Sequence, residues 1–459
     1  MDTYRQKLAS LGLEIPSILL PEKSQSAAAF DMQKWAVIAC DQFTQSGDYW
    51  KKIKDTVSLS PSTLNLIFPE VFLSDGNEKA RIAGIHSNMR RYLKEGVFGE
   101  PHKGFIYIER DTPFQKKRRG LIAAIDLEKY DWKPRSRPLI RCTEGTVAER
   151  LPVRMDIRRS APLELSHILL LIDDDTDSLL PAIAELAKNA APLYNTPLMM
   201  DCGNVAGWLL KEEEDSHNRQ TFAFIAEKLE ELCSRSVSRY GGKEKYEFLP
   251  FLFAVGDGNH SLAAAKGIWE EYKAANNCTA EKLPSHPCRY AMVEIENIYD
   301  PAIQFEPIHR LILNAGFDET LSILSSLPDF SCRFKDNAEE LAKLCTCMPA
   351  ANRFGVISKG RYALIETSFA GIATAGLQPL LDSALQDGKP LSIDYIHDKE
   401  ELLRLAEDKN SITTGILLPP VQKSGLFETV ARLGPLPRKS FSMGHSAEKR
   451  FYLECRSLF

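Results

Sequence analysis

Apolar and polar residues follow one another along the chain in segments that fit short strands and amphipathic helices. The apolar run 35–43 predicts a buried strand with a polar end, and the segment 78–96 has helical spacing and a glycine stop. Two further apolar runs, 104–110 and 119–127, flank a basic segment and predict a β-hairpin. Beyond them strand-like and helix-like segments alternate. The pattern therefore predicts a mixed α/β fold with mixed sheets.

The length of the chain predicts more than one core. A chain of 459 residues is longer than a single hydrophobic core usually supports. We predict an N-terminal α/β region over 1–155, a central region over 156–315 and a C-terminal α/β region over 316–459. No repeat of fixed period divides the chain further.

The segment 251–269 changes character within a few residues. An apolar run ends at Val255, the polar stretch 257–261 follows, and helix-forming residues resume at Leu262. A helix that begins after a buried strand presents unpaired N–H groups and a partial positive charge, which suit a phosphate or carboxylate. Within the stretch, Gly258 would let a ligand approach the backbone closely, Asn259 can donate a hydrogen bond, and His260 titrates near neutrality.

A helix cap explains the same stretch about equally well. Asp, Asn and Ser are the usual capping residues, and Asp-Gly-Asn is ordinary turn chemistry. The same tripeptide occurs at 75–77, in what the sequence predicts to be a plain loop. The stretch 257–261 differs from it by the buried strand before it, by His260 and by the helix directly after it. The residues alone leave both alternatives open.

An acidic run at 173–177 raises the question of a divalent cation site. Its spacing resembles a calcium loop, but Ser178 stands where that loop needs glycine and Ala184 where it needs a carboxylate. A strand-to-helix turn with acids at the helix N-terminus is the favoured interpretation. The alternative is that one of these acids binds a Mg²⁺ ion that a phosphate ligand brings with it.

The segment 141–159 combines five arginines with two glutamates. A solvated face accounts for this charge and is the favoured interpretation, and the alternative is a clamp for phosphate or carboxylate. Glu144 lies in a Thr-Glu-Gly-Thr turn whose small residues leave its carboxylate accessible. The arginines are Arg141, Arg150, Arg154, Arg158 and Arg159.

Two later segments add candidate residues. His309 and Arg310 lie between a proline and an apolar run, where a histidine is usually structural. Lys439 and Ser440 lie near a glycine and suit phosphate binding, although the P-loop pattern is absent. The motifs of serine hydrolases, zinc proteases and dinucleotide-binding folds are absent from the positions they would need, which disfavours those classes.

Composition and charge narrow the class of protein. The formal charge of −5 disfavours a general nucleic-acid binder, and the basic cluster 116–120 is interpreted as a solvated hairpin tip. The ten cysteines form no C-x-x-C pair, so reduced thiols are expected. The N-terminus has no signal-peptide pattern, and the longest apolar runs are too short to span a membrane. We expect a cytoplasmic protein without membrane or nucleic-acid partners.

Taken in order, the motifs resemble a bacterial and archaeal family, numbered 1015 among the domains of unknown function. In that family a strand leads into Asp-Gly-His-His-Arg and a helix, and the stretch 257–261 stands at that place. The family's Pro-Thr-His-Arg resembles 307–310, and its Pro-x-Lys-Ser matches 437–440. Its His-Glu-x-x-Thr resembles 143–146 less closely. The motifs span 143–440, which is most of the chain.

The family is in turn similar to the ParB/sulfiredoxin superfamily, which includes an ADP-dependent serine kinase. The resemblance implies a strand–turn–helix nucleotide-binding unit within 156–315, with phosphate held by Gly258, Asn259, His260 and Ser261. Asn259 stands where the family has histidine and Ser261 where it has arginine, so Arg310 or Lys439 would supply the missing cation. The turn has no cysteine, which excludes sulfiredoxin chemistry.

These observations predict a nucleotide-binding phosphotransferase that uses ATP or ADP with Mg²⁺ and acts on the hydroxyl or carboxyl group of a small molecule. In this hypothesis Asp257 binds Mg²⁺ or acts as a base, His260 orients the phosphate or donates a proton, and Glu144 is a second candidate base. The expected nucleotide-binding residues are Gly258, Asn259, Ser261, His309, Arg310, Lys439 and Ser440. Two alternatives remain: a regulatory protein that binds a nucleotide or metabolite without turnover, and a scaffold in which the turn only caps a helix.

Overall fold

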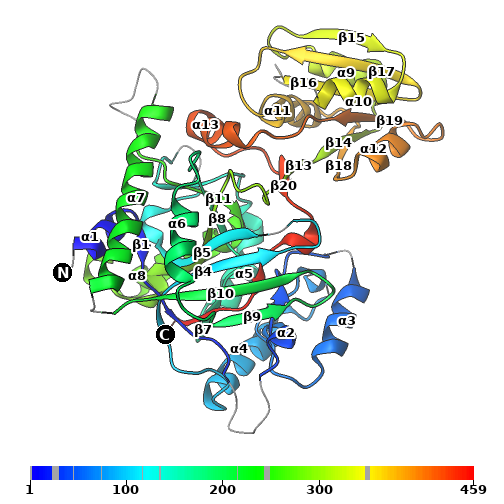
Figure 1. Cartoon of the computed structure of the whole chain (residues 1–459). Helices are drawn as coiled ribbons and strands as arrows, with labels where there is room; N and C mark the ends of the chain where they lie inside the picture. Colours follow the sequence, from blue (N-terminus) through cyan, green and yellow to red (C-terminus); the bar gives the residue numbers. More distant parts are fainter. Residues whose placement is uncertain are drawn as a thin grey trace. The chain divides into compact units, whose positions relative to one another are not determined.

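The structure is a computed structural model, and it describes residues 3–22, 30–44, 46–73, 75–115, 117–133, 136–213, 216–241, 249–346 and 352–458. The chain divides into two compact units (Figure 1). Unit 1 comprises 1–142, 146–303 and 445–459, and unit 2 comprises 143–145 and 304–444. This division into units follows from contacts within the chain, whereas the three regions 1–155, 156–315 and 316–459 came from the sequence. The three regions therefore stay a prediction.

Unit 1 is built on a mixed sheet of ten strands. Its central strands are buried because they consist almost entirely of apolar residues, as in the run Leu169–Ile172. Neighbouring strands run parallel in two pairs, β6 with β11 and β8 with β12, and antiparallel elsewhere in the main path. In spatial order the strands are β6 (Ile140–Cys142), β11 (Phe253–Asp257), β8 (Leu169–Ile172), β12 (Tyr290–Asn297), β5 (Arg118–Asp126), β4 (His102–Asp111), β10 (Asn204–Lys211) and β9 (Tyr194–Pro197), with β1 (Leu13–Glu14) beside β5 and β2 (Ser17–Ile18) beside β4.

Helices and two short strand pairs complete unit 1. The helices are α1 (Thr3–Ser10), α2 (Met32–Trp35), α3 (Gly47–Val57), α4 (Glu78–Lys94), α5 (Leu151–Arg158), α6 (Leu179–Ala187), α7 (Ser216–Tyr240) and α8 (Asn259–Ala275). Residues 445–459, which follow unit 2 in sequence, belong to unit 1 and form two strand pairs there. Strand β21 (Phe451–Tyr452) pairs with β3 (Val37–Ile38), and strand β22 (Cys455–Ser457) pairs with β7 (Leu163–Leu165).

The expected hairpin is confirmed, but its basic segment is only partly the solvated tip that the sequence predicted, with Lys117 exposed and Arg118 buried. Strands β4 and β5 pair in antiparallel orientation. Arg118 is only 5% exposed and its Nε lies 2.8 Å from Oε1 of Glu296. The physical reason is that β5 begins at Arg118, so its side chain lies within the sheet beside β12, where a buried carboxylate faces it. Lys116 lies outside the described residues.

Unit 2 contains a six-stranded antiparallel sheet with helices on both faces (Figure 1). Its strands, in spatial order, are β15 (Ser331–Lys335), β17 (Arg361–Thr367), β16 (Asn352–Ser358), β19 (Thr413–Leu417), β14 (His309–Leu313) and β18 (Ser392–Ile396). One apolar core includes residues of α9 (Phe317–Leu324) and α11 (Ala373–Gln386), and another includes residues of α10 (Ala338–Thr346) and α12 (Lys399–Ala406). The remaining elements are α13 (Lys423–Leu433) and the pair β13 (Phe305–Pro307) and β20 (Phe441–Met443).

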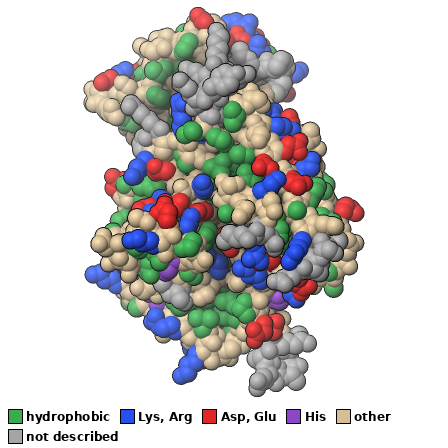
Figure 2. All heavy atoms as spheres, turned by 90° about the vertical axis from the view of Figure 1, so that its left-hand side faces the viewer, with side chains coloured by type: hydrophobic (Ala, Val, Ile, Leu, Met, Phe, Trp, Pro, Cys, Tyr) green, Lys and Arg blue, Asp and Glu red, His purple; other side chains and the backbone are tan. Residues whose placement is uncertain are grey.

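The two units together confirm the mixed α/β fold class, with mixed and antiparallel sheets. No helix in the described ranges is both long enough and apolar enough to cross a membrane. On the face shown in Figure 2 the coloured Lys and Arg side chains are interspersed with Asp and Glu, without one broad basic area. That distribution agrees with the small net charge of the sequence.

Candidate functional site

The turn between β11 and α8 is built around a glycine in a left-handed conformation. Gly258 is the N-cap of α8 with φ of +77°, and it supplies no side-chain capping bond. A Cβ atom added there would lie 3.0 Å from Cγ1 of Ile168, so packing as well as backbone conformation requires glycine. Helix α8 begins at Asn259, three residues earlier than the sequence pattern suggested. Asn259, His260 and Ser261 therefore form its first turn, whose N–H groups precede the helical ladder.

The other Asp-Gly-Asn of the chain, at 75–77, also has its glycine in a left-handed conformation. Gly76 has φ of +75°, and residues 75–77 form the loop that the sequence predicted, which leads directly into α4. Around Gly76, however, an added Cβ would meet nothing within 4 Å. The helix that follows does not distinguish the two turns. The turn at 257–261 differs because it is packed against Ile168, the residue before β8, and follows an interior strand of the sheet.

Asp257 and Asn259 bring polar atoms to the start of α8. Oδ2 of Asp257 lies 3.1 Å from Nζ of Lys449, and Oδ1 accepts from the backbone N–H of Gly258 at 3.0 Å. Oδ1 of Asn259 is buried and has no hydrogen-bond partner in the described part of the chain. An unpaired buried oxygen is costly, so it marks a place where a donor on a ligand would be favourable.

His260 is positioned by the backbone. Its Nε2 accepts from the N–H of Val147 at 3.2 Å, so the neutral ring carries its proton on Nδ1. This bond connects the first turn of α8 with the segment that precedes α5. A lone pair engaged in this way makes Nε2 of His260 a poor general base.

A second histidine, His167, lies beside Ser261. Its Nε2 is 3.4 Å from Oγ of Ser261 and 3.9 Å from Oδ2 of Asp41. The hydroxyl of Tyr452 donates to Sγ of Cys40 at 3.1 Å, so it accepts from Nδ1 of His167, which lies 2.7 Å away. Neutral His167 then directs the lone pair of Nε2 toward Ser261. This arrangement suits proton abstraction from a hydroxyl group.

The charge on Asp41 would stabilise a protonated His167. Burial would raise the pKa of Asp41, but the His167 imidazole, the Gln42 side chain and the Lys449 ammonium together hold it below its ordinary value. The ammonium of Lys449 thus acts on two carboxylates, those of Asp257 and Asp41.

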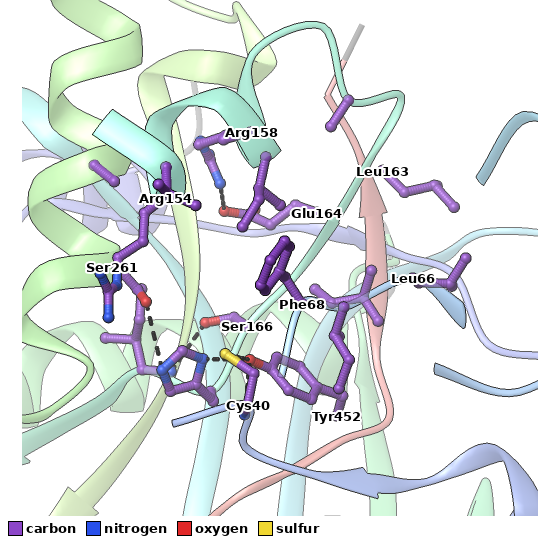
Figure 3. A pocket seen from close by; sticks show the side chains of 18 of the residues that line it. Cys40, Leu66, Phe68, Arg154, Arg158, Leu163, Glu164, Ser166, Ser261 and Tyr452 are labelled. Carbon is purple, nitrogen blue, oxygen red and sulfur yellow. Dashed lines mark hydrogen bonds and ion pairs between the residues drawn. The ribbon is translucent and has the colours of Figure 1, made fainter. Parts of the chain in front are cut away.

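A cavity of about 120 Å³ adjoins Ser261 and His167 (Figure 3). We call it the α5 cavity, since Val153, Arg154, Ile157 and Arg158 of α5 line it. Its other lining residues are Cys40, Leu66, Ile67, Phe68, Glu70, Leu73, Met89, Ala161, Leu163, Glu164, Leu165, Ser166, His167, Ile168, Ser261, Ala264, Tyr452 and Leu458.

The arginine-rich segment is only partly the solvated face that the sequence favoured. Arg159 is exposed and pairs with Glu271, as expected. Arg141 is 5% exposed and donates to the carbonyl oxygens of Pro138 and Leu249. Arg154 and Arg158 of α5 pair with Glu70 and Glu164 at the α5 cavity. The reason is that α5 packs against α8, which turns these two side chains inward.

The candidates in unit 2 gather around Arg310. This side chain is fully buried, its Nε donates to Oε1 of Gln378 at 2.8 Å, and Nη1 donates to the carbonyl oxygen of Lys439 at 2.9 Å. Ser440 is also buried and donates to the carbonyl oxygen of Pro437 at 2.6 Å. Burial lowers the pKa of Arg310 to about 10, although the carboxylate of Glu144 acts in the opposite direction. The structure therefore places Glu144, Arg310, Lys439 and Ser440 in one region of unit 2.

His309 does not join this group. Successive strand residues face opposite sides of a sheet, so His309 faces away from Arg310 on β14. Its Nδ1 accepts from the N–H of Leu418 at 3.1 Å, and burial followed by the charge of Arg310 lowers its pKa to about 4. A histidine that is neutral and bonded to the backbone has a structural role here.

The acidic run forms the strand-to-helix turn that the sequence favoured. Oδ2 of Asp174 accepts from the N–H groups of Ser178 and Leu179 at the start of α6, at 2.7 and 2.9 Å. Within the described ranges no three His, Cys, Asp or Glu residues are grouped so that they could hold a metal ion. The expected Mg²⁺ site at Asp257 stays a prediction.

Sequence reasoning missed four residues near the turn: Asp41, His167, Lys449 and Tyr452. Asp41 had a signal, because it lies at the polar end of the run 35–43. The others lie in no motif. They reach the turn only through tertiary structure, since Tyr452 belongs to β21 and Lys449 lies two residues before that strand.

Unit 1 is thus a mixed α/β unit with a glycine-capped helix N-terminus, a lysine–aspartate pair and a histidine beside a small cavity. The chain belongs to a family described as "Protein of unknown function (DUF1015)", whose profile matches residues 23–384. No curated protein matches its sequence.

Three solved structures show a weak likeness to this chain. A free serine kinase in complex with AMP is 12% identical with a TM-score of 0.37, covering 76% of this chain and 95% of the kinase. A conserved hypothetical protein from Pyrococcus furiosus is 12% identical with a TM-score of 0.33, covering 72% and 90%. SbnI with a C-terminal truncation, from Staphylococcus aureus, is 11% identical with a TM-score of 0.36, covering 73% and 87%. Scores this low carry no argument about the ligand of this chain.

Proposed function

We propose that the chain is a nucleotide-dependent phosphotransferase whose nucleotide phosphate binds at the N-terminus of α8. The observation that supports the proposal is the glycine-capped first turn of α8 with the ammonium of Lys449 and the imidazole of His167 beside it. Phosphoryl transfer depends mainly on positioning and charge neutralisation, and these groups can supply both.

Phosphate binding would use backbone and side-chain donors together. The N–H groups of the first helical turn and the helix dipole attract an anion. Lys449 would provide the cation that Ser261 does not, since the family motif has arginine there. Lys449 replaces Arg310 and Lys439 in this role within the proposal, because it already lies 3.1 Å from Asp257.

Asp257 would then be free to act as a Mg²⁺ ligand. Magnesium is usually held by one or two carboxylates together with phosphate oxygens and waters, so a cluster of three protein ligands is not needed. A phosphate that takes over the ammonium of Lys449 would leave the carboxylate of Asp257 to the metal.

The transfer step needs a base for the acceptor hydroxyl. The acceptor oxygen forms a bond to the transferred phosphorus, the bond from that phosphorus to the bridging oxygen of the nucleotide breaks, and the hydroxyl proton passes to Nε2 of His167. Asp41, 3.9 Å from that nitrogen, would stabilise the resulting imidazolium. His260 would keep the first turn of α8 in place through its bond to Val147.

The candidate residues of unit 2 enter the proposal differently. Arg310 and Ser440 are committed to the backbone of 437–440, so they would act by shaping that segment. The roles of Lys439 as a cation and of Glu144 as a base stay predictions.

Calorimetric titration with ADP and ATP, each with and without Mg²⁺, tests the proposal. We expect saturable binding by the wild type and at least tenfold weaker binding by Lys449→Met, because the phosphate loses a direct ion pair. Lys7→Met is the control, since Lys7 pairs with Glu230 on the surface of unit 1. The absence of a binding signal under all four conditions would contradict the proposal.

Two other outcomes correspond to the alternatives. Nucleotide binding without turnover of any compound in a panel of hydroxy acids, amino acids and neutral alcohols would favour a regulatory protein. If no nucleotide binds and His260→Ala only lowers stability, by about 1 kcal/mol, the turn is a helix cap in a scaffold.

A further inference from the structure

The α5 cavity indicates what kind of acceptor the site would take. We propose that it binds a small uncharged alcohol with an apolar body, and that the hydroxyl of this molecule receives the phosphoryl group. The binding part of this inference stands on the cavity alone, whereas the transfer part rests on the proposed function.

The cavity limits the size of its occupant. One water needs about 10–15 Å³ of such volume, so about 120 Å³ holds a molecule of roughly eight to twelve non-hydrogen atoms. This space is too small for a nucleotide. A nucleotide at the start of α8 and an acceptor in the cavity would therefore occupy different places.

Apolar side chains make up most of the cavity wall. In Figure 3, Leu66 and Leu163 lie on one side and Arg154 and Ser261 on the other, with Phe68 between them. An occupant with an aliphatic or aromatic body would bury its apolar surface against these side chains, which favours binding.

The charged groups of the wall are already paired in the described structure. Arg154 pairs with Glu70, and Nη1 of Arg158 lies 2.5 Å from Oε1 of Glu164, whose Oε2 also pairs with Arg456 at 2.6 Å. The carboxylate or ammonium of an amino acid would have to break such a pair or remain unpaired in an apolar space, and both are costly.

The thiol of Cys40 and the phenol of Tyr452 add uncharged polar groups to the wall. Burial raises the pKa of the Cys40 thiol and of the Tyr452 phenol, so neither carries charge at neutral pH. At the same end, Oγ of Ser261 and Nε2 of His167 offer a donor and an acceptor to one hydroxyl group. The wall thus matches a neutral molecule with a single hydroxyl at one end.

The transfer step follows from this placement. The alcohol oxygen bonds to the transferred phosphorus, the bridging phosphorus–oxygen bond of the nucleotide breaks, and the alcohol proton passes to His167. The nucleotide leaves with one phosphate fewer, and the product is an alkyl phosphate.

A matched pair of probes tests the inference on the full chain. 2-Phenylethanol falls within the expected size, and 3-phenyllactate carries the same skeleton with a carboxylate on the carbinol carbon. Binding of each is measured by calorimetry without nucleotide, and phosphorylation of each is followed by phosphorus NMR with ADP or ATP and Mg²⁺. We expect 2-phenylethanol to bind at least tenfold more tightly than 3-phenyllactate.

One variant locates the binding site. Val153 lies on α5 in the wall and is half-buried, so Val153→Phe should narrow the cavity and weaken binding of 2-phenylethanol at least tenfold. Asp156→Phe adds the same side chain at an exposed position of α5 that does not line the cavity, and it should leave binding unchanged.

The outcomes separate this inference from the proposed function. If 2-phenylethanol binds as expected but no nucleotide binds, the cavity assignment stands and the phosphotransferase proposal fails. If a nucleotide binds but 3-phenyllactate or serine binds or reacts better than 2-phenylethanol, the acceptor assignment is overturned and the proposed function survives. Equal binding by Val153→Phe and wild type would also overturn it.

Discussion

Gly258 shows how one residue can serve both the fold and the proposed site. Its φ of +77° and the contact with Ile168 exclude a side chain, and the same absence of a side chain opens the start of α8. Gly76 shares the conformation without the contact, so the chain contains its own matched control.

We predict that the two glycine-to-alanine variants differ. Gly76→Ala should cost about 1–2 kcal/mol of stability from the left-handed conformation alone. Gly258→Ala should cost more, because its Cβ meets Ile168, and it should also weaken ADP binding. Urea denaturation and calorimetry of both variants check this. Equal losses of stability with unchanged ADP binding would contradict the assignment of the turn.

His309 makes the stability of unit 2 depend on pH. Its pKa is about 4 in the folded protein against 6.5 for the free side chain. Between pH 6.5 and pH 4 the unfolded chain therefore takes up a proton that the folded protein does not. Stability is therefore full above pH 6.5 and falls as the pH is lowered toward 4. Between pH 7 and pH 5 the loss amounts to about 2 kcal/mol.

The variant His309→Asn tests this prediction. Asparagine can accept the same bond from Leu418 but does not titrate, so the variant should lose about 2 kcal/mol less than wild type on acidification to pH 5. Urea denaturation at both pH values measures the difference, in which other titrating groups cancel. An identical loss in both proteins would rule out a buried neutral histidine.

At the scale of elements, the hairpin β4–β5 fixes the segment that carries Lys449. Arg110 and Arg118 each donate from Nη1 to the carbonyl oxygen of Glu448 at 2.8 Å, and Arg110 also bonds to Ala447 at 2.8 Å. Two buried guanidinium groups thus hold the residues just before β21. Lys449 reaches Asp257 because its backbone is fixed in this way.

We predict that Arg118→Met destabilises the chain by about 3–5 kcal/mol, since it removes the buried guanidinium partner of Glu296 and a donor to the carbonyl oxygen of Glu448. The control Arg361→Met removes an exposed pair with Asp318 and should cost less than about 1 kcal/mol. Thermal or urea denaturation compares the two. Similar small losses would mean that the Arg118 pair does not anchor the segment.

The elements that could be predicted from the sequence are those whose pattern is local. The hairpin β4–β5 and helix α4 follow from apolar runs, glycine stops and spacing. The start of α8 could not be predicted, because polar residues such as those at 259–261 are typical of a turn. The burial of Arg118 could not be predicted either, because a basic cluster usually indicates a solvent-exposed segment. In both places neighbouring strands supply what the local pattern lacks.

At the scale of the whole molecule, unit 2 has its own sheet and its own two cores. We predict that the fragment 304–444 folds alone. Of unit 2, the fragment lacks only residues 143–145. In the described part of the chain, two backbone hydrogen bonds join these residues to Leu436. Circular dichroism and a cooperative urea transition of the fragment check this. A fragment without a cooperative transition would show that unit 2 depends on the rest of the chain.

The arrangement of the whole chain decides which residues of the candidate site could be found from the sequence. The stretch 257–261 could be found because strand, turn and helix are contiguous. Asp41, His167 and Lys449 could not, since they are more than a hundred residues apart and only the sheet of unit 1 and the segment that follows unit 2 bring them to one turn.

The central claim is that a nucleotide phosphate binds at the start of α8 beside Lys449. Calorimetric titration of wild type, Lys449→Met and Lys7→Met with ADP and Mg²⁺ tests it most directly. The account predicts saturable binding by wild type and Lys7→Met, and at least tenfold weaker binding by Lys449→Met. Absence of binding by the wild type, or equal affinity in all three proteins, would contradict it.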